Sequence, residues 1–407
     1  MKYRILDLYS VKDFLLSIKE IKEFFGEDEL QSDEIGDGNV NFVYIVKSKK
    51  DPKKALIVKQ AVPYLRCAGE EFALSRERMT FEIRALQNYA KIVSKYVPKI
   101  YFSDEEMSIV VMEYLSNHII MRKGLIEGGI YNDFSEHISD FLASSLFYTS
   151  SLYLQSDQKR LLMDRFNQNR ELCKLTEDFV FTFAYMDHES NFIDKNCELE
   201  AKELFERMDF RKNLLELKYL FMTKSDALLH GDLHTGSIML NEKETFVIDP
   251  EFAFFGPFGF DIGALVANLF NSYISHMFNE GNDEYREWIL QTVSQIYEKF
   301  ETKFLNLWNG VDSSALITKG FIEDDALDEY KKEFMDSIFK ESVGFCGAKM
   351  ARRVFGIAGV EEIRGIKDDM KRKKAALKAL EVGLFLIKEY KNIKTPTELT
   401  EVIRSMS

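Results

Sequence analysis

HGDLHTGS (230–237) and, after a short interval, DPE (249–251) form the stretch around which the chain is organised. Between them the apolar runs IML and TFVI flank the polar tetrad NEKE, a pattern typical of a β-hairpin. A hairpin brings its outer ends together, so Asp232, Asp249 and Glu251 should lie in one small region. Clustered carboxylates repel one another unless a cation or a shared proton relieves them. Mg²⁺ binds carboxylate oxygens and keeps positions for phosphate, so the stretch predicts a phosphoryl-transfer site.

Composition limits the classes of protein to consider. The 407 residues suffice for two or three domains, and the net charge of −13 argues against nonspecific binding to nucleic acid or to an anionic membrane. It does not argue against a nucleotide ligand. No run of eighteen apolar residues occurs, the N-terminus lacks the apolar segment of a signal peptide, and the four cysteines are scattered without a CxxC pair. We therefore expect a cytoplasmic protein with reduced thiols and no membrane span.

The chain changes character near residue 115. The first thirty residues have helical spacing. Strands are predicted at 42–46, 55–58 and 109–112, and a helix is predicted at 75–94. Beyond residue 115, residues 130–230 contain neither glycine nor proline and must be mostly helical, and the chain after the hairpin is helical again. The sequence predicts an α+β protein with a β-rich domain (1–115) and a helical domain (116–407).

A glycine turn and a lysine mark the first domain. Gly36-x-Gly38 precedes a strand and does not link a strand to a helix, so the Rossmann fingerprint does not fit. The turn is either a plain hairpin turn or a loop whose backbone N–H groups cover phosphates. Lys59 ends the next strand among apolar residues. If it points inward it needs an anionic partner, such as phosphate or Glu82 on the following helix; otherwise it is exposed at the strand end.

The central stretch also has competing interpretations. His230, Asp232 and His234 are all residue types that ligate zinc, but no further histidine or cysteine follows at ligand spacing. We favour Asp232 as the carboxylate that orients an attacking hydroxyl and accepts its proton. Asp249 and Glu251 would then hold Mg²⁺ against the triphosphate, unless they are ordinary acidic residues after an exposed strand.

Two later features have structural alternatives. Asp261 begins a helix, so it is either the helix N-cap or the acceptor for backbone N–H groups of the Asp232 loop, and in neither role is it catalytic. Arg352 and Arg353 follow an apolar helix. They are either a solvated helix end or a source of positive charge for a transferring phosphoryl group and of paired hydrogen bonds to substrate hydroxyls.

At this point the motifs resemble a known family. The glycine turn, the strand lysine, the helix glutamate and the strand end EYL (113–115) resemble the nucleotide lobe of the protein-kinase fold. HGDLHTGS with its hairpin and aspartate resembles the branch of that fold that phosphorylates aminoglycosides, choline and other small molecules. Within that branch the chain is most similar to the 5-methylthioribose kinases of methionine salvage, through IGDGNVNFVY, VKQAVPYLR, DPEFAFFGPFGFDIG and GAKMARRVFGIAGV. The resemblance spans about residues 34–360 and implies a bilobal fold with a small β-rich N-lobe and a large, mostly helical C-lobe.

The resemblance implies a role for each matching position. Asp232 would be the catalytic base toward the 1-hydroxyl of 5-methylthioribose, Asp249 and Glu251 would ligate Mg²⁺, and Arg352 and Arg353 would face the substrate or the transferred phosphate. Family members are typically homodimers. ATP would be bound by a larger set, in which the segment 113–115 is the hinge that meets adenine: Asn39, Asn41, Lys59, Glu82, Glu113, Tyr114, Leu115, Asp249, Pro250 and Glu251.

Some positions depart from the wider fold. Protein kinases carry a metal-binding asparagine five residues after the catalytic aspartate, where this chain has Ser237. The second metal contact is therefore expected on Glu251, and the role of Ser237 stays open. The rival functions are a related kinase acting on an aminoglycoside, choline or homoserine, and a non-catalytic nucleotide-binding protein. The sequence leaves open the preferred 5-thioalkyl group, the arginine that contacts substrate, the dimer interface and the number of Mg²⁺ ions.

Overall fold

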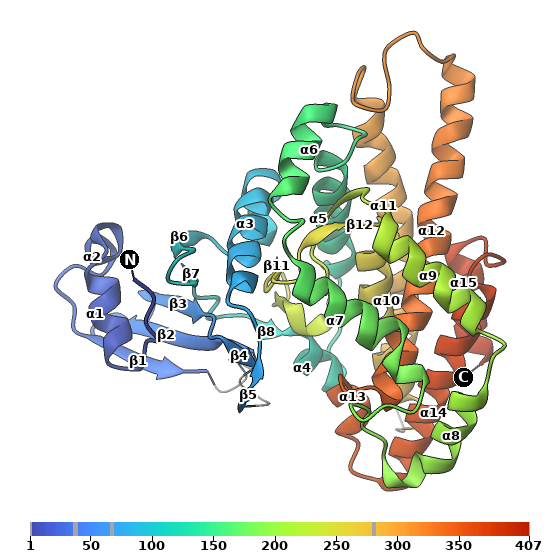
Figure 1. Cartoon of the computed structure of the whole chain (residues 1–407), viewed down its shortest axis with the longest axis horizontal. Helices are drawn as coiled ribbons and strands as arrows, with labels where there is room; N and C mark the ends of the chain where they lie inside the picture. Colours follow the sequence, from blue (N-terminus) through green and yellow to red (C-terminus); the bar gives the residue numbers. More distant parts are fainter. Residues whose placement is uncertain (1, 36–39, 66–68, 279–281, 407) are drawn as a thin grey trace.

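The computed structural model describes residues 2–35, 40–65, 69–278 and 282–406. The chain forms two lobes, one built on an antiparallel sheet and a larger one built of helices (Figure 1). This arrangement confirms the α+β class and the division into a small β-rich lobe and a large helical lobe. In these ranges, no helix is both long and apolar enough to cross a membrane.

The sheet of the small lobe has five strands in the order β1-β2-β3-β7-β6, and every neighbouring pair is antiparallel. The three predicted strands are its centre, and the two that the sequence did not reveal, β1 and β6, are its edges. An edge strand needs less apolar surface because solvent covers part of it, and β1 reads LQSDE. The bounds are β1 (Leu30–Glu34), β2 (Phe42–Ser48), β3 (Ala55–Gln60), β6 (Ile100–Asp104) and β7 (Ile109–Glu113).

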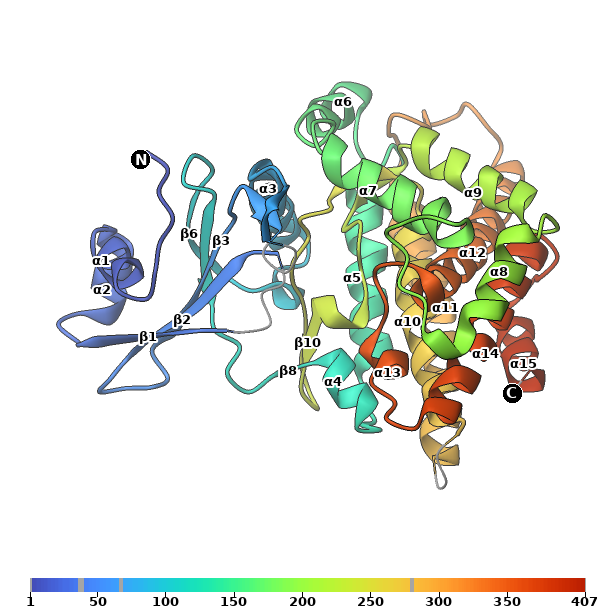
Figure 2. The ribbon, with the colours of Figure 1, turned by 60° about the horizontal axis from the view of Figure 1, so that its bottom comes forward.

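The two faces of this sheet pack against different helices. Ile109 and Val111 of β7 join a core with α1 (Ser10–Leu16) and α2 (Lys19–Phe25). Val110 alternates with them and joins the main core together with α3 (Glu77–Ile92), on the side of the large lobe (Figure 2). The predicted helix at 75–94 is therefore confirmed, and it lies between the sheet and the large lobe.

The large lobe is helical on both sides of the predicted hairpin, as the absence of glycine and proline from residues 130–230 indicated. Its helices are α4 (Met121–Ile126), α5 (Phe134–Tyr148), α6 (Ser156–Asp164), α7 (Arg170–Phe181), α8 (Glu198–Glu206), α9 (Arg211–Thr223), α10 (Gly259–His276), α11 (Asp283–Asn309), α12 (Asp324–Phe355), α13 (Glu361–Arg364), α14 (Asp369–Glu389) and α15 (Pro396–Ser405). Short 3₁₀ turns occupy Ser94–Tyr96, Phe183–Tyr185, Lys195–Cys197 and Thr235–Ser237.

Helix α12 packs against both α10 and α14, and its N-terminal half projects at the top of the large lobe (Figure 1). The backbones of α10 and α12 approach closely at Gly263, where a Cβ atom would lie only 2.4 Å from the carbonyl oxygen of Ser342. A larger residue at position 263 would therefore push the two helices apart. The buried C-terminal half of α12 is fixed by this packing.

The predicted hairpin forms as β10 (Ile238–Leu240) and β11 (Thr245–Val247), with Ile238 opposite Val247. A further strand, β8 (Ile119–Ile120), pairs with β10 and extends the hairpin to a three-stranded sheet. The chain thus passes from the last central strand of the small lobe directly to the edge of the hairpin. The domain boundary at residue 115 stays a prediction. The remaining strands are β4 (Tyr64–Leu65) paired with β5 (Gly69–Ala73), and β9 (Ala227–Leu229) paired with β12 (Phe254–Gly256).

Candidate active site

The hairpin brings together the two motifs that flank it. The N–H of Ile248 donates to the carbonyl of Ser237 at 3.0 Å, so the pairing extends to the residue before Asp249. The imidazole of His230 joins the same segments, because Nε2 lies 2.9 Å from the Ile248 carbonyl and Nδ1 accepts the N–H of Asp232 at 3.3 Å. His230 is therefore engaged in bonds that hold the two motifs together, which contradicts its use as a zinc ligand.

Asp261 fixes the conformation of the loop that carries Asp232. Its carboxylate accepts the backbone N–H of His230 at 2.6 Å and that of Gly231 at 3.0 Å. Of the two predicted roles, the bond to the Asp232 loop is confirmed, and the helix N-cap is wrong, since Phe258 occupies that position. Gly231 has φ +85°, and a Cβ atom there would lie 2.2 Å from the carbonyl oxygen of Phe252, so the turn requires glycine.

Cationic side chains surround Asp232. Nζ of Lys349 donates to its Oδ1 at 3.0 Å, and Nη2 of Arg352 lies 3.9 Å from the same oxygen. Burial raises the pKa of the Asp232 carboxyl, but the ammonium of Lys349, together with the guanidinium groups of Arg353 and Arg352, holds that pKa well below its usual range. Asp232 is therefore ionised at neutral pH, as a general base must be.

Arg352 and Arg353 are both about 7% exposed, so the interpretation as a solvated helix end is wrong. Nη1 of Arg353 donates to the carbonyl of Ala358 at 3.0 Å, and its Nε and Nη2 have no hydrogen-bond partner among the described residues. Nε of Arg352 has none either. Buried guanidinium N–H groups without partners are costly, and an anionic or hydroxyl-bearing ligand would satisfy them.

Lys59 of β3 is buried, so its interpretation as an exposed strand end is also wrong. Its ammonium lies 2.8 Å from Oε2 of Glu82 and also bonds the carboxylate of Asp249. Burial lowers the pKa of Lys59, but these two carboxylates outweigh it and raise the pKa above its ordinary value. Lys59 stays charged between the helix α3 and the second acidic motif.

Three carboxylates of this region are placed to share a cation. Ligand oxygens from Glu82, Asp249 and Glu251 all lie within 4.8 Å of one another, and no other such group of histidine, cysteine or acidic residues occurs in the described part of the chain. Asp232 does not belong to the group. An all-carboxylate donor set fits Mg²⁺ better than zinc. Asp249 has φ +68°, an uncommon conformation for a residue other than glycine.

Glu251 reaches back to the small lobe. Its Oε2 accepts a hydrogen bond of 2.9 Å from Nδ2 of Asn41 and lies 3.7 Å from Nε of Arg78, which also bonds Oδ1 of Asn41. Burial, followed by the charge of Asp249, raises the pKa of the Glu251 carboxyl. Asn169 holds the backbone of this motif, donating from Nδ2 to the Glu251 carbonyl at 2.9 Å. The contacts of Asn41 and Arg78 with Glu251 connect the two lobes across the site.

Ser237 has a positional role that its sequence did not reveal. Its hydroxyl donates to the carbonyl of Asp232 at 3.2 Å and lies 3.1 Å from Nδ1 of His234. Burial lowers the pKa of His234 to about 3. The imidazole is therefore neutral, and its Nε2 lies 3.5 Å from Oδ2 of Asp232. Ser237 thus orients the ring beside the Asp232 carboxylate.

The predicted hinge begins at Glu113, the last residue of β7. The backbone N–H of Glu113 donates to the carbonyl of Lys99 at 2.9 Å, Tyr114 is half-buried and Leu115 is buried. Pro250, between the two acidic residues, is also buried. Asn39 lies outside the described residues, as do Gly36 and Gly38 of the glycine turn. The nucleotide contacts of all these positions stay predictions.

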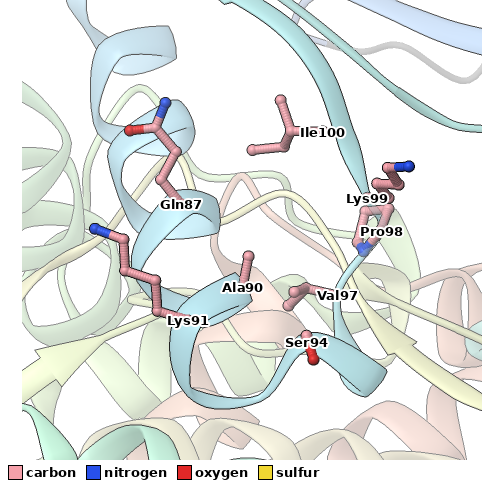
Figure 3. A pocket seen from close by; sticks show the side chains of 8 residues that line it. All are labelled: Gln87, Ala90, Lys91, Ser94, Val97, Pro98, Lys99 and Ile100. Atoms are coloured by element: carbon pink, nitrogen blue, oxygen red, sulfur yellow. The ribbon is translucent and has the colours of Figure 1, made fainter.

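A cavity of about 560 Å³ opens elsewhere in the small lobe, between the end of α3 and the start of β6 (Figure 3). None of the residues that line it belongs to the acidic group or to the loop that carries Asp232. Its two lysines project from opposite sides of the cavity (Figure 3). Its lining residues are Gln87, Ala90, Lys91, Ser94, Val97, Pro98, Lys99 and Ile100.

Sequence reasoning missed several residues of the site. Lys349 lies in the quoted segment GAKMARR, one helical turn before Arg352 and Arg353, so helical spacing alone would have placed it on their face. Arg78 had a similar signal, one turn before Glu82 on the same helix. Asn169 had no such signal, because it lies in a polar loop and its side chain donates to a backbone carbonyl that is distant in the sequence.

Comparison with known proteins gives consistent matches. The model of the phosphotransferase enzyme family matches residues 34–294. Methylthioribose kinase 1 of Oryza sativa subsp. japonica is 40% identical over 374 residues, covering 89% of this chain and 85% of that protein. Methylthioribose kinase of Geobacillus sp. (strain WCH70) is 40% identical over 368 residues, covering 90% and 88%. Among solved structures, a choline kinase from Cryptosporidium parvum is 14% identical, covering 94% of this chain and 97% of that chain, with a TM-score of 0.49.

Proposed function

Because the chain belongs to the phosphotransferase enzyme family and, within it, to the methylthioribose kinases, we propose that it transfers the γ-phosphoryl group of ATP to 5-methylthioribose. The acceptor is the 1-hydroxyl, and the product is 5-methylthioribose 1-phosphate, an intermediate of methionine salvage. The observation that carries this assignment is the position of the Asp232 carboxylate among buried cationic side chains.

The charge around Asp232 favours a sugar over the rival acceptors. Lys349, Arg352 and Arg353 all act on its carboxylate, and Arg122 stands close enough to influence Arg353. A cationic acceptor such as an aminoglycoside or choline would meet this positive charge directly. A neutral polyhydroxyl sugar meets hydrogen-bond donors, and the phosphate that it gains is stabilised by the same cations.

Catalysis rests on positioning and on electrostatics. Asp232 accepts the proton of the 1-hydroxyl while the sugar oxygen bonds to the γ-phosphorus and the bond to the leaving ADP breaks. Arg352 and Arg353, whose guanidinium N–H groups are not all bonded by described residues, bind the charge of the transferring group or the neighbouring hydroxyls. Lys59, held by Glu82, contacts the phosphates of ATP.

Asp249 and Glu251 would hold Mg²⁺, for which the carboxylate group with Glu82 is a suitable donor set. When bound, the ion neutralises the charge of the triphosphate. Asn41 and Arg78 both act on Oε2 of Glu251 and fix the orientation of that carboxylate.

Adenine would be bound at the hinge through backbone groups of Glu113, Tyr114 and Leu115, and Asn39, Asn41 and Pro250 would complete the nucleotide site. We also propose a cytoplasmic homodimer, on the basis of the resemblance. The free thiols of Cys173, Cys197 and Cys346 agree with a reducing compartment.

A substrate panel tests this function. Purified protein is supplied with ATP and Mg²⁺ and one acceptor at a time: methylthioribose, ribose, choline, homoserine or kanamycin, with ADP formation as the readout. We expect rapid ADP formation with methylthioribose and little with the others. Faster turnover of choline or kanamycin would refute the assignment. Tight ATP binding without turnover of any acceptor would favour a non-catalytic nucleotide-binding protein.

A further inference from the structure

Lys349 is a buried ammonium in direct contact with the catalytic carboxylate. It is about 2% exposed and comes from the C-terminal half of α12. On one side its Nζ donates to Oδ1 of Asp232 at 3.0 Å, and on the other it lies 4.7 Å from the centre of the Phe260 ring. An ammonium over an aromatic face is attracted by the ring. The cation is therefore held between two partners of the large lobe.

The helix that carries Lys349 is itself fixed. The close approach at Gly263 sets its distance from α10, and the hydroxyl of Tyr185 donates to the carbonyl of Ala348 at 3.0 Å. Lys349 is thus delivered by a packed helix and not by a flexible loop. A long side chain that is immobilised in this way can define the orientation of a partner.

The two oxygens of Asp232 have different surroundings. Oδ1 faces Lys349 and, at 3.9 Å, Arg352. Oδ2 faces the neutral imidazole of His234 at 3.5 Å, beyond ordinary hydrogen-bond distance. Lys349 therefore engages one oxygen of the base, and the other, to which no described residue donates a hydrogen bond, is available to an acceptor hydroxyl.

We propose that Lys349 is a positioning residue, whose ammonium engages Oδ1 of Asp232 so that an ionised Oδ2 faces the acceptor. The proposal rests on the assignment of Asp232 as the base of the proposed reaction. Lys349 itself exchanges no proton in the step. The hydroxyl proton moves to Oδ2, the sugar oxygen bonds to the γ-phosphorus, and ADP leaves with the electrons of the broken bond.

Electrostatics agrees with this geometry. Burial lowers the pKa of Lys349 to about 8, although Asp232 opposes the shift, and Arg352 and Arg353 add to it. The charge of Lys349 also lowers the pKa of Asp261 on α10, against the larger effect of burial, which raises it. The pair of Lys349 and Asp232 is therefore charged at pH 7. Without the ammonium, burial would be opposed by fewer charges, and the pKa of Asp232 would rise.

The test compares three variants with the wild type. Lys349→Met removes the charge and keeps an unbranched chain, Lys349→Arg keeps the charge, and Lys331→Met is the matched control. Lys331 is a second buried lysine of α12, bonded to Asn309 at 2.6 Å and to no residue of the site. We expect Lys349→Met to lower kcat on the order of 100-fold and to leave the KM for ATP unchanged. In the pH profile of kcat/KM, the acid limb should move to higher pH by about one unit or more. Lys349→Arg should recover much of the rate, and Lys331→Met should resemble the wild type.

A second measurement does not depend on the acceptor. The carboxyl carbons of ¹³C-labelled aspartate are titrated by NMR in the free protein, and the Asp232 signal is identified by its loss in Asp232→Asn. We expect the pKa of Asp232 to rise in Lys349→Met. An unchanged pKa, or equal loss of kcat in the Lys349→Met and Lys331→Met variants, would overturn the proposal. If the wild type phosphorylates no acceptor, the proposed function fails, and the titration alone still decides the role of Lys349.

Discussion

Replacing Asp261 tests how the loop that carries Asp232 is held. Its carboxylate accepts two buried backbone N–H groups, from His230 and Gly231, at 2.6 and 3.0 Å. No other described side chain is hydrogen-bonded to these two N–H groups. Asp261→Ala leaves both without a protein partner, whereas Asp261→Asn keeps one acceptor oxygen and places an NH₂ group against the second N–H.

The expected magnitude follows from these two bonds. A hydrogen bond to a charged group contributes about 1.5–3 kcal/mol, so Asp261→Ala should lower the free energy of unfolding of the large lobe by about 3–6 kcal/mol. Asp261→Asn should cost about half as much. Both variants displace the loop that carries Asp232, and a displacement of about 1 Å can lower kcat on the order of 100-fold. Because Asp261 does not touch the acidic group around Lys59, the KM for ATP should stay near that of the wild type.

Urea unfolding followed by circular dichroism, together with steady-state kinetics, measures both effects. Asp283→Ala is the control, because Asp283 is an exposed acid in the first turn of α11 and pairs only with Arg286 in the described structure. We expect the control to be the most stable variant, Asp261→Asn to be less stable, and Asp261→Ala to be the least stable. If Asp261→Ala unfolded and turned over like the control, the carboxylate would not be what holds the loop.

Three further substitutions have defined outcomes. Asp232→Ala should abolish turnover and leave ATP affinity, measured by calorimetry, unchanged; a normal rate would contradict its role as the base. Glu251→Ala should remove the Mg²⁺-dependent activity, and an unchanged Mg²⁺ titration of the rate would mean that Asp249 acts without it. Gly231→Ala should lower the thermal midpoint, because a non-glycine residue at φ +85° costs about 1–2 kcal/mol and its Cβ would clash with the Phe252 carbonyl; an unchanged midpoint would show that the turn relaxes.

The sequence predicted the elements that have strong periodic signals. The central strands, helix α3 and the hairpin follow from apolar runs of fixed period, and the hairpin alone was sufficient to bring the segments of Asp232 and Asp249 together. Edge strands β1 and β6 were missed because partial exposure removes the apolar alternation from which strands are predicted.

Site residues that belong to one short sequence motif could be predicted. Site residues that come together only through the packing of distant segments could not. The position of Lys349 at Asp232 depends on the packing of α12 against α10, which no spacing within one segment reveals. The same holds for Arg78 and Asn41, which reach Glu251 from the other lobe. The two roles left open for Asp261 could be separated only by seeing which N–H groups its carboxylate accepts.

Identification of the product tests the central claim most directly. Methylthioribose, ATP and Mg²⁺ are incubated with the wild type and with Asp232→Asn, and the product is analysed by ³¹P NMR with coupling to the sugar protons. The account predicts one new phosphate ester, coupled to the proton at C1, formed by the wild type and not by the variant. A phosphate on another hydroxyl, no ester at all, or the same ester formed equally fast by Asp232→Asn would contradict it.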